Sequence, residues 1–98
     1  MSKLRLDYKR CEAHVLDEKV CLSAKESHLL EYFIRNKEQV LTREQIFNKI
    51  WGNESSTEIS AVELYVFYLR KKIDLKKSNV VLETVRGVGY CLKEATDE

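Results

Sequence analysis

Apolar and charged positions alternate along the first third of the chain. Residues 4–8 and 11–15 each place an apolar side chain at every second position, and a polar pair separates the two stretches. A second polar stretch precedes a third apolar run at residues 20–22. A period of two that is interrupted by short polar turns predicts the strands of a small antiparallel meander with one solvated face.

The period then becomes that of a helix. Ser23 and Thr42 each stand three residues before a Glu or Gln side chain, which is the spacing of a capping box, so helices are expected to begin directly after them. The first helix should end near residue 36 and the second at Gly52. A short extended link joins the two.

A third helix is predicted over residues 59–73 by their length and by apolar side chains spaced three and four apart. Its capping box falls either at residues 55–58 or at residues 60–63. The side chains expected to face the core from the three helices are Leu29, Leu30, Phe33, Ile34, Ile46, Phe47, Ile50, Trp51, Val62, Val66, Leu69 and Ile73.

The end of the chain has the pattern of a β-hairpin. Two strand-like stretches, residues 80–85 and 90–93, flank a turn that contains Gly87 and Gly89, and glycine permits the positive φ that such turns use. A strand meander, three helices and a hairpin in this order predict an α+β fold of the winged helix-turn-helix type, with the hairpin as the wing.

The distribution of charge changes the picture that the total charge gives. The 98 residues fit one domain, and their net charge of +1 gives no sign of a polyanionic partner. Residues 65–93, however, hold seven Lys and Arg residues against two acidic ones, a net charge of +5, whereas the tail at residues 94–98 holds three acids. The positive charge is therefore concentrated on the third helix and the hairpin, the elements that a winged helix presents to duplex DNA.

The outward face of the third helix offers candidate base contacts. Phe67 and Lys71 point away from the predicted core, and Phe67 either reaches thymine methyl groups in a major groove or packs under the wing or at a protein interface. Packing is the expectation for its neighbour Tyr68. Glu63 either accepts a hydrogen bond from a cytosine amino group or completes the capping box with Ser60.

No motif predicts catalysis, a metal site or a cofactor. The three cysteines lack the spacing of a disulfide framework or of a zinc site, and each lies in a strand-like stretch where a half-buried apolar role is expected. The chain has no G-x-S-x-G, no H-E-x-x-H and no Gly-rich loop that opens a helix, so an enzyme is not expected. The cysteine pattern, the short apolar runs and the lack of a secretory signal favour a reducing cytoplasm and no membrane partner.

Four motifs within residues 3–93 occur together in one known family. They comprise residues 22–30, 41–52, 68–73 and 84–90. The last reads Thr-Val-Arg-Gly-Val-Gly-Tyr, and it is highly specific when it follows Leu-Arg-Lys-Lys, as it does here. With these motifs the chain resembles the OmpR/PhoB-type output, or effector, domain of bacterial response regulators.

The resemblance implies a four-stranded N-terminal sheet, a three-helix core and a hairpin wing. It also implies that the third helix enters the major groove, that the wing touches the minor groove or its phosphates, and that the loop before the third helix contacts RNA polymerase. The positions that match phosphate contacts in relatives are Arg70, Thr84, Arg86 and Tyr90. Trp51 matches a position whose indole N–H points to a phosphate, although a core role is equally open. The candidate DNA-binding residues are Ser60, Ala61, Glu63, Leu64, Phe67, Tyr68, Arg70, Lys71, Thr84, Arg86, Gly87, Tyr90 and Trp51, and the candidate polymerase-contact loop is Asn53, Glu54, Ser55, Ser56 and Thr57.

The resemblance further implies a set of partners. Members of the family carry an N-terminal receiver domain that a sensor kinase serves, and they bind direct repeats as tandem pairs. The expected partners are therefore double-stranded DNA, RNA polymerase, a second copy of the chain in tandem, and the receiver domain and sensor kinase of a full-length protein. Residues 3–93 are expected to be the effector domain and residues 94–98 an acidic tail, with the receiver domain absent from this chain.

The chain departs from the family in the recognition helix. Many relatives place Arg and Thr at the positions of Ser60 and Ala61, and polar or basic residues at those of Phe67 and Tyr68. The altered residues are base-reading ones, so the target sequence is expected to differ more than the ability to bind DNA. An alternative function is that of a winged-helix module that binds protein and no longer binds DNA.

Overall fold

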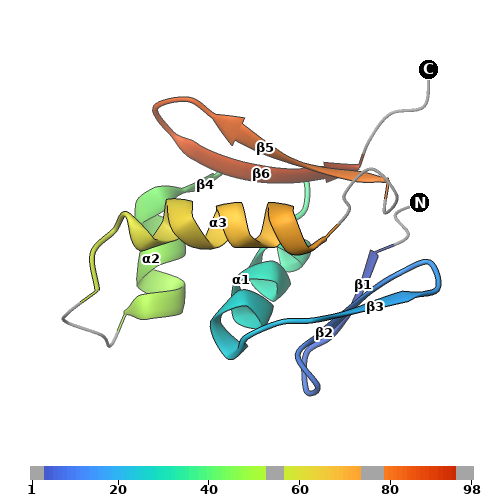
Figure 1. Cartoon of the computed structure of the whole chain (residues 1–98). Helices are drawn as coiled ribbons and strands as arrows, with labels where there is room; N and C mark the ends of the chain where they lie inside the picture. The colour runs from blue at the N-terminus through green and yellow to red at the C-terminus, as the bar shows by residue number, and fades with distance from the viewer. Residues whose placement is uncertain (1–3, 53–56, 74–78, 95–98) are drawn as a thin grey trace.

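The structure is a computed structural model that describes residues 4–52, 57–73 and 79–94, and it arranges three helices with two small antiparallel sheets (Figure 1). The N-terminal sheet packs against α1, and the C-terminal hairpin runs along α3 with its turn on the side of β4 and α2. The elements are β1 (Leu4–Asp7), β2 (Glu12–Val15), β3 (Glu18–Cys21), α1 (Ala24–Arg35), β4 (Leu41–Thr42), α2 (Arg43–Trp51), α3 (Ala61–Lys72), β5 (Val80–Val85) and β6 (Gly89–Glu94).

The predicted meander is confirmed as the sheet β1-β2-β3, in which Ala13 pairs with Leu6 on one side and with Val20 on the other. The four-stranded N-terminal sheet that the resemblance implied is not found among the described residues, where this sheet has three strands. The short β4 pairs instead with β6, through Leu41 and Tyr90, so it belongs to the sheet of the wing.

The prediction that all three cysteines are half-buried within strands is only partly right. Cys91 is buried in β6, and Cys11 is half-buried but lies in the turn after β1 with a φ of 53°. Cys21 is exposed, because its register sets it opposite Glu12 on the polar face of the meander.

Both predicted capping boxes at α1 and α2 are confirmed. The Ser23 hydroxyl accepts from the Glu26 N–H at 3.1 Å, and the Ser23 N–H donates to the Glu26 carboxylate at 2.8 Å. Thr42 and Gln45 exchange the same two hydrogen bonds at 3.0 and 2.8 Å. The helices end where expected, with Asn36 and Gly52 as C-caps. Gly52 keeps right-handed helical angles, so a left-handed cap is not what ends α2.

The start of α3 differs from the prediction. Ser60 precedes the helix, but its side chain makes no capping hydrogen bond, so the capping box at residues 60–63 is wrong. The chain enters α3 through a backbone turn in which Ala61 N–H donates to the Glu58 carbonyl, and this gives Ser60 a helical backbone (φ −62°, ψ −15°) in place of the extended one that a capping serine adopts. The alternative box begins at residue 55, which lies outside the described residues.

The three helices form the core as their apolar pattern predicts. Every predicted core position is buried except Ile34 and Phe47, which are half-buried and pack against the core. Polar ties join the helices as well: the buried Glu26 carboxylate of α1 accepts a hydrogen bond from Lys72 Nζ at the end of α3, at 2.7 Å. No helix in the described part of the chain is long and apolar enough to cross a membrane.

The predicted hairpin is confirmed with a three-residue turn, because Val85 pairs with Gly89 across it. Gly87 has a φ of 78°, which is the left-handed conformation that favours glycine. Gly89 serves a different purpose from the expected one: it is a residue of β6, and a Cβ atom there would collide with the Leu41 carbonyl of β4. The close approach of two strands, and no positive φ, is what requires glycine at this position.

Candidate nucleic-acid interface

The outward face of α3 combines apolar and cationic side chains. Val62, Val66 and Leu69 turn into the core, so the opposite side of the helix faces solvent, as the period predicts. Leu64 and Phe67 are exposed at 47% and 53%, respectively. The other exposed residues of the helix are Glu63, Arg70, Lys71 and Lys72.

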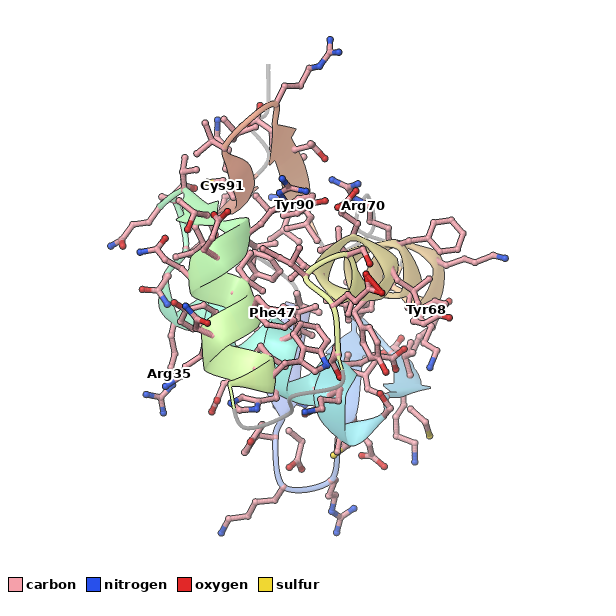
Figure 2. The ribbon with its side chains drawn as sticks, turned by 90° about the vertical axis from the view of Figure 1, so that its left-hand side faces the viewer. Arg35, Phe47, Tyr68, Arg70, Tyr90 and Cys91 are labelled. Carbon is pink, nitrogen blue, oxygen red and sulfur yellow. The ribbon has the colours of Figure 1, made fainter. Side chains whose placement is uncertain are left out.

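Neither aromatic residue in the middle of α3 packs under the wing. The Phe67 ring is open to solvent, with Lys71 Nζ 5.5 Å from its centre. Tyr68 is half-buried and packs edge-on against Tyr65, at 5.4 Å between ring centres. Figure 2 shows Tyr68 on the side of α3 away from the hairpin. Tyr68 therefore packs against a neighbour on the same helix and not under the wing, and packing at a protein interface stays a prediction.

Arg70 joins α3 to the wing. Its Nη2 donates to the Leu82 carbonyl at 2.6 Å and to the Thr84 hydroxyl at 2.8 Å, and its guanidinium lies 5.8 Å from the centre of the Tyr90 ring. Figure 2 shows Arg70 and Tyr90 together between α3 and the hairpin. Both hydrogen bonds leave one nitrogen, Nη2, whose two N–H groups are held in fixed directions by the planar guanidinium, so this side chain fixes the position of the hairpin relative to the helix.

A second polar junction lies where the first turns of α2 and α3 meet the turn of the hairpin. Arg43 Nη1 and Glu63 Oε1 are 2.9 Å apart. The pair borders an open cavity of about 250 Å³, which Thr84 and Tyr90 also line. Burial raises the pKa of the Tyr90 phenol, the nearby Glu63 charge raises it further, and the charges of Arg70 and Arg43 oppose this. Charged residues from two helices, α2 and α3, therefore act electrostatically on one residue of the hairpin.

Trp51 lies within the core. It is 3% exposed, stacks on Phe47 and meets the edge of the Tyr65 ring, and Lys25 Nζ lies 5.7 Å from its ring centre. Figure 2 shows Phe47 between α2 and α3, where these rings gather. The core role that was open for Trp51 is therefore what the structure shows.

The structure brings part of the predicted site together. Glu63, Arg70, Thr84 and Tyr90 meet at the turn end of the hairpin, and Arg86 and Gly87 are exposed in the turn itself. Ser60 is exposed and Ala61 half-buried at the start of α3. Of the predicted polymerase-contact loop, residues 53–56 lie outside the described residues, and Thr57 is half-buried.

The sequence reasoning missed Arg43. Its partner Glu63 is 20 residues away, in a different helix, so no local spacing could have paired them. Among the described residues, no group of three or more His, Cys, Asp or Glu side chains is placed to hold a metal ion.

Comparison with known proteins identifies the family. A family model described as "Transcriptional regulatory protein, C terminal" matches residues 17–92. An uncharacterized transcriptional regulatory protein of Bacillus subtilis, YkoG, is 39% identical over 90 residues, which are 92% of this chain and 40% of that protein. The response regulator MprA of Mycolicibacterium vanbaalenii is 41% identical over 93 residues, which are 95% of this chain and 40% of MprA.

The fold agrees with solved structures of the same kind. The DNA-binding domain of Bacillus subtilis CssR superposes with a TM-score of 0.78 at 29% identity, covering 91% of this chain and 98% of that domain. The chain spans about 40% of the length of the curated relatives that it matches. The resemblance to response regulators is thereby confirmed, and this chain belongs to the OmpR/PhoB-type effector domains, the family of C-terminal domains of transcriptional regulatory proteins.

Proposed function

We propose that the chain binds duplex DNA in a sequence-specific manner and so serves as the output domain of a two-component response regulator. The observation that carries this proposal is one continuous surface, in which Arg70 ties the exposed face of α3 to the wing. Exposed cations lie on both parts of it, with Arg70 and Lys71 on the helix and Arg86 on the turn. The similarity to a domain that is itself named DNA-binding supports the proposal.

In the proposed complex, α3 lies in the major groove and the wing lies on the minor groove or the backbone. Arg86 of the exposed turn is assigned to a phosphate, as are Thr84 and Tyr90, which pair with each other next to the turn. Arg70 reaches the same region from the helix. Phosphate contacts of this kind position a protein on the duplex and carry no sequence information directly.

The base-reading residues are assigned to the outward face of α3. Phe67 and Leu64 form an exposed apolar ridge, and apolar side chains recognise the thymine methyl group in the major groove. Ser60, Glu63 and Lys71 supply the polar contacts to base edges. The small residues Ala61, at the start of α3, and Gly87, in the hairpin turn, allow close approach of the DNA, and Tyr68 is assigned a contact at the edge of the helix away from the hairpin.

The remaining proposed partners follow from the family, because the relatives that this chain matches include response regulators and are more than twice its length. The proposed full-length protein carries a receiver domain that a sensor kinase phosphorylates, and it acts in the bacterial cytoplasm. The proposed partners on DNA are a second copy bound in tandem to a direct repeat and RNA polymerase, contacted through the loop before α3. A single copy is expected to bind weakly, because linking two binding modules raises the effective concentration of the second.

The exposed Phe67 and Leu64 also favour a second candidate, a winged-helix module that binds a protein partner. The two candidates differ in their dependence on salt. A DNA-binding protein loses affinity as salt rises, with a log–log slope of about −0.9 for each phosphate that it neutralises. An interface dominated by apolar side chains has no such slope on duplex DNA.

The test is a salt titration on duplexes selected from a random pool. We expect Arg86→Ala to weaken binding to selected and random duplexes alike and to make the slope shallower by about 0.9, because one phosphate contact is lost. The matched control is Arg35→Ala. Arg35 is exposed at the end of α1, on the side of the molecule away from the hairpin (Figure 2), so its loss should leave the slope unchanged. A wild-type protein with no salt-dependent binding would contradict the proposed function.

A further inference from the structure

The ion pair between Arg43 and Glu63 lies where it adds little to the stability of the fold, so stability does not account for it. It joins the first turn of α2 to the first turn of α3, with both side chains exposed and their atoms 2.9 Å apart. Exposed ion pairs of this kind contribute little to the stability of a fold. Both helices are already held by buried apolar side chains on their other faces.

Three of the side chains that line the cavity beside this pair can donate hydrogen bonds. The guanidinium of Arg43 and the hydroxyls of Thr84 and Tyr90 line it, together with the hairpin residues Val85, Gly87, Val88 and Gly89. The Thr84 hydroxyl accepts from Arg70, and a hydroxyl that accepts a hydrogen bond still has its own proton to donate. Glu63 is the one acidic residue among the lining residues, and its carboxylate is paired with the guanidinium of Arg43.

We infer that this cavity receives a phosphate group of the DNA backbone. In the free protein, Glu63 is paired with Arg43, the cation that binds this phosphate in the complex. The inference rests on the proposed function. A phosphate oxygen accepts from the guanidinium fork as a carboxylate does, so the two anions compete for Arg43. The cavity is open, and its lining residues come from the first turns of α2 and α3 and from the turn end of the hairpin, which the proposed complex places against the DNA.

The exchange makes Glu63 a determinant of specificity. When the phosphate takes Arg43, the carboxylate of Glu63 is released toward the DNA, where it is repelled unless a base edge offers it a donor. The cytosine amino group in the major groove is such a donor. On DNA without it, Glu63 keeps Arg43 and the phosphate contact is not made. A repulsive element of this kind penalises wrong sequences and leaves the right one unaffected.

The experiment compares Glu63→Gln with Glu83→Gln. Glu83 is also an exposed acid in an ion pair, with Lys93 at 3.5 Å, but it lies on β5 and does not line the cavity, so its variant controls for the loss of one negative charge. Each protein is titrated with salt on a selected duplex and on a random-sequence duplex, and its thermal unfolding is recorded.

Glu63→Gln is expected to bind random DNA more tightly than Glu83→Gln does, and its salt slope on random DNA should steepen by about 0.9 because Arg43 now neutralises one more phosphate. The slope on the selected duplex should stay that of the wild type. Arg43→Gln should make the slope on the selected duplex shallower by about 0.9, and adding Glu63→Gln to it should change neither slope further.

The inference is overturned if Glu63→Gln changes the affinity and slope on random DNA no more than Glu83→Gln does. It is also overturned if Arg43→Gln leaves the slope on the selected duplex unchanged, and this second variant decides the matter should Glu63→Gln unfold. Failure of the proposed function looks different, because the wild-type protein then shows no salt-dependent binding at all.

Discussion

The side chain of Arg70 does two things at once. It carries a positive charge on the proposed DNA-binding surface, and it holds the Leu82 carbonyl and the Thr84 hydroxyl within 2.8 Å. A charge alone is replaceable by lysine, whereas two N–H groups held in fixed directions by a planar guanidinium are not, because a lysine ammonium rotates on a flexible stem. The structure therefore gives Arg70 a positioning role in addition to any phosphate contact.

Arg70→Lys separates these two roles. We expect it to weaken DNA binding about tenfold, or about 1.4 kcal/mol, because the ties to β5 are lost, while the salt slope stays near that of the wild type since the charge remains. Arg86→Lys is the control, because no tie of this kind holds Arg86, and it should bind nearly as well as the wild type. Equal and small effects of the two substitutions, measured in the same salt titration, would contradict the positioning role.

Sequence reasoning at the scale of single residues succeeded where the period of the chain decides orientation. The helical period alone predicted that Phe67 is exposed and that Val62 and Val66 are buried. It failed where a partner comes from another element. Glu63 was expected either to cap its own helix or to read a base, and its actual partner in the free chain, Arg43, is set by how α2 and α3 pack.

The wing is held to the helices through the two-residue strand β4. Leu41 and Thr42 pair with Tyr90 and Gly89, and the ladder passes directly into α2, whose Arg43 N–H donates to the Val88 carbonyl at 3.3 Å. The close approach of β4 and β6 leaves no room for a side chain at Gly89. The position of the hairpin relative to β4 therefore depends on Gly89, a glycine that lies in a strand and not in a turn.

Gly89→Ala is expected to destabilise the domain by about 3 kcal/mol, because the added methyl group meets backbone atoms that cannot rotate away. Gly87→Ala is the control: nothing lies within 4 Å of a Cβ atom there, so its cost is that of the left-handed conformation, about 1–2 kcal/mol. Denaturant unfolding measures both. A smaller loss for Gly89→Ala than for Gly87→Ala would show that β4 and β6 can separate at little cost.

Elements with a local signature were predictable from the sequence. Capping boxes placed the starts of α1 and α2, and strict alternation placed the meander, because both signals depend on residues within four positions of each other. The start of α3 was not predictable in this way. A backbone turn forms it, and no side chain marks such a turn. The pairing of β4 with the wing could not be predicted from local sequence either, since it joins residues nearly fifty positions apart.

The stability of the whole domain is coupled to pH through Glu26. Burial by itself raises the pKa of this carboxyl, but the hydrogen bonds from Lys72 and the Ser23 N–H and the charge of Lys72 outweigh it, so the pKa lies below its ordinary value of 4.5. The unfolded chain then binds more protons than the folded one in acid. The contribution of Glu26 is present above its unfolded pKa and is lost as the pH falls through the folded pKa.

We expect the free energy of unfolding to fall as the pH is lowered from about 6 to about 3, and Glu26→Gln to make this dependence shallower because an amide has no proton to gain. At neutral pH the variant should be less stable by about 1–2 kcal/mol, since the charged hydrogen bond to Lys72 is weakened. Glu44→Gln, at an exposed position in the first turn of α2, is the control. Urea unfolding at several pH values measures all three proteins, and parallel curves for the wild type and Glu26→Gln would contradict the assignment.

At the scale of the whole molecule, the order of the elements and the segregation of charge were enough to predict a winged helix. The total charge alone pointed the other way, because the acidic tail and the nearly neutral N-terminal part offset the basic helix and hairpin. The sheets were less predictable, since the short β4 carries no sign of which sheet it joins.

The ties of Arg70 have one further consequence for how the domain meets a duplex. Because α3 and the hairpin are held as one rigid piece, the base step read in one groove and the backbone position gripped by the turn stand at a fixed offset along the helical axis of the DNA. The domain then measures length and rotational phase as well as sequence. A half-site has to match the distance along the DNA axis and the rotational phase at once. Local overwinding or bending of the duplex therefore changes the fit even when the base sequence is unchanged.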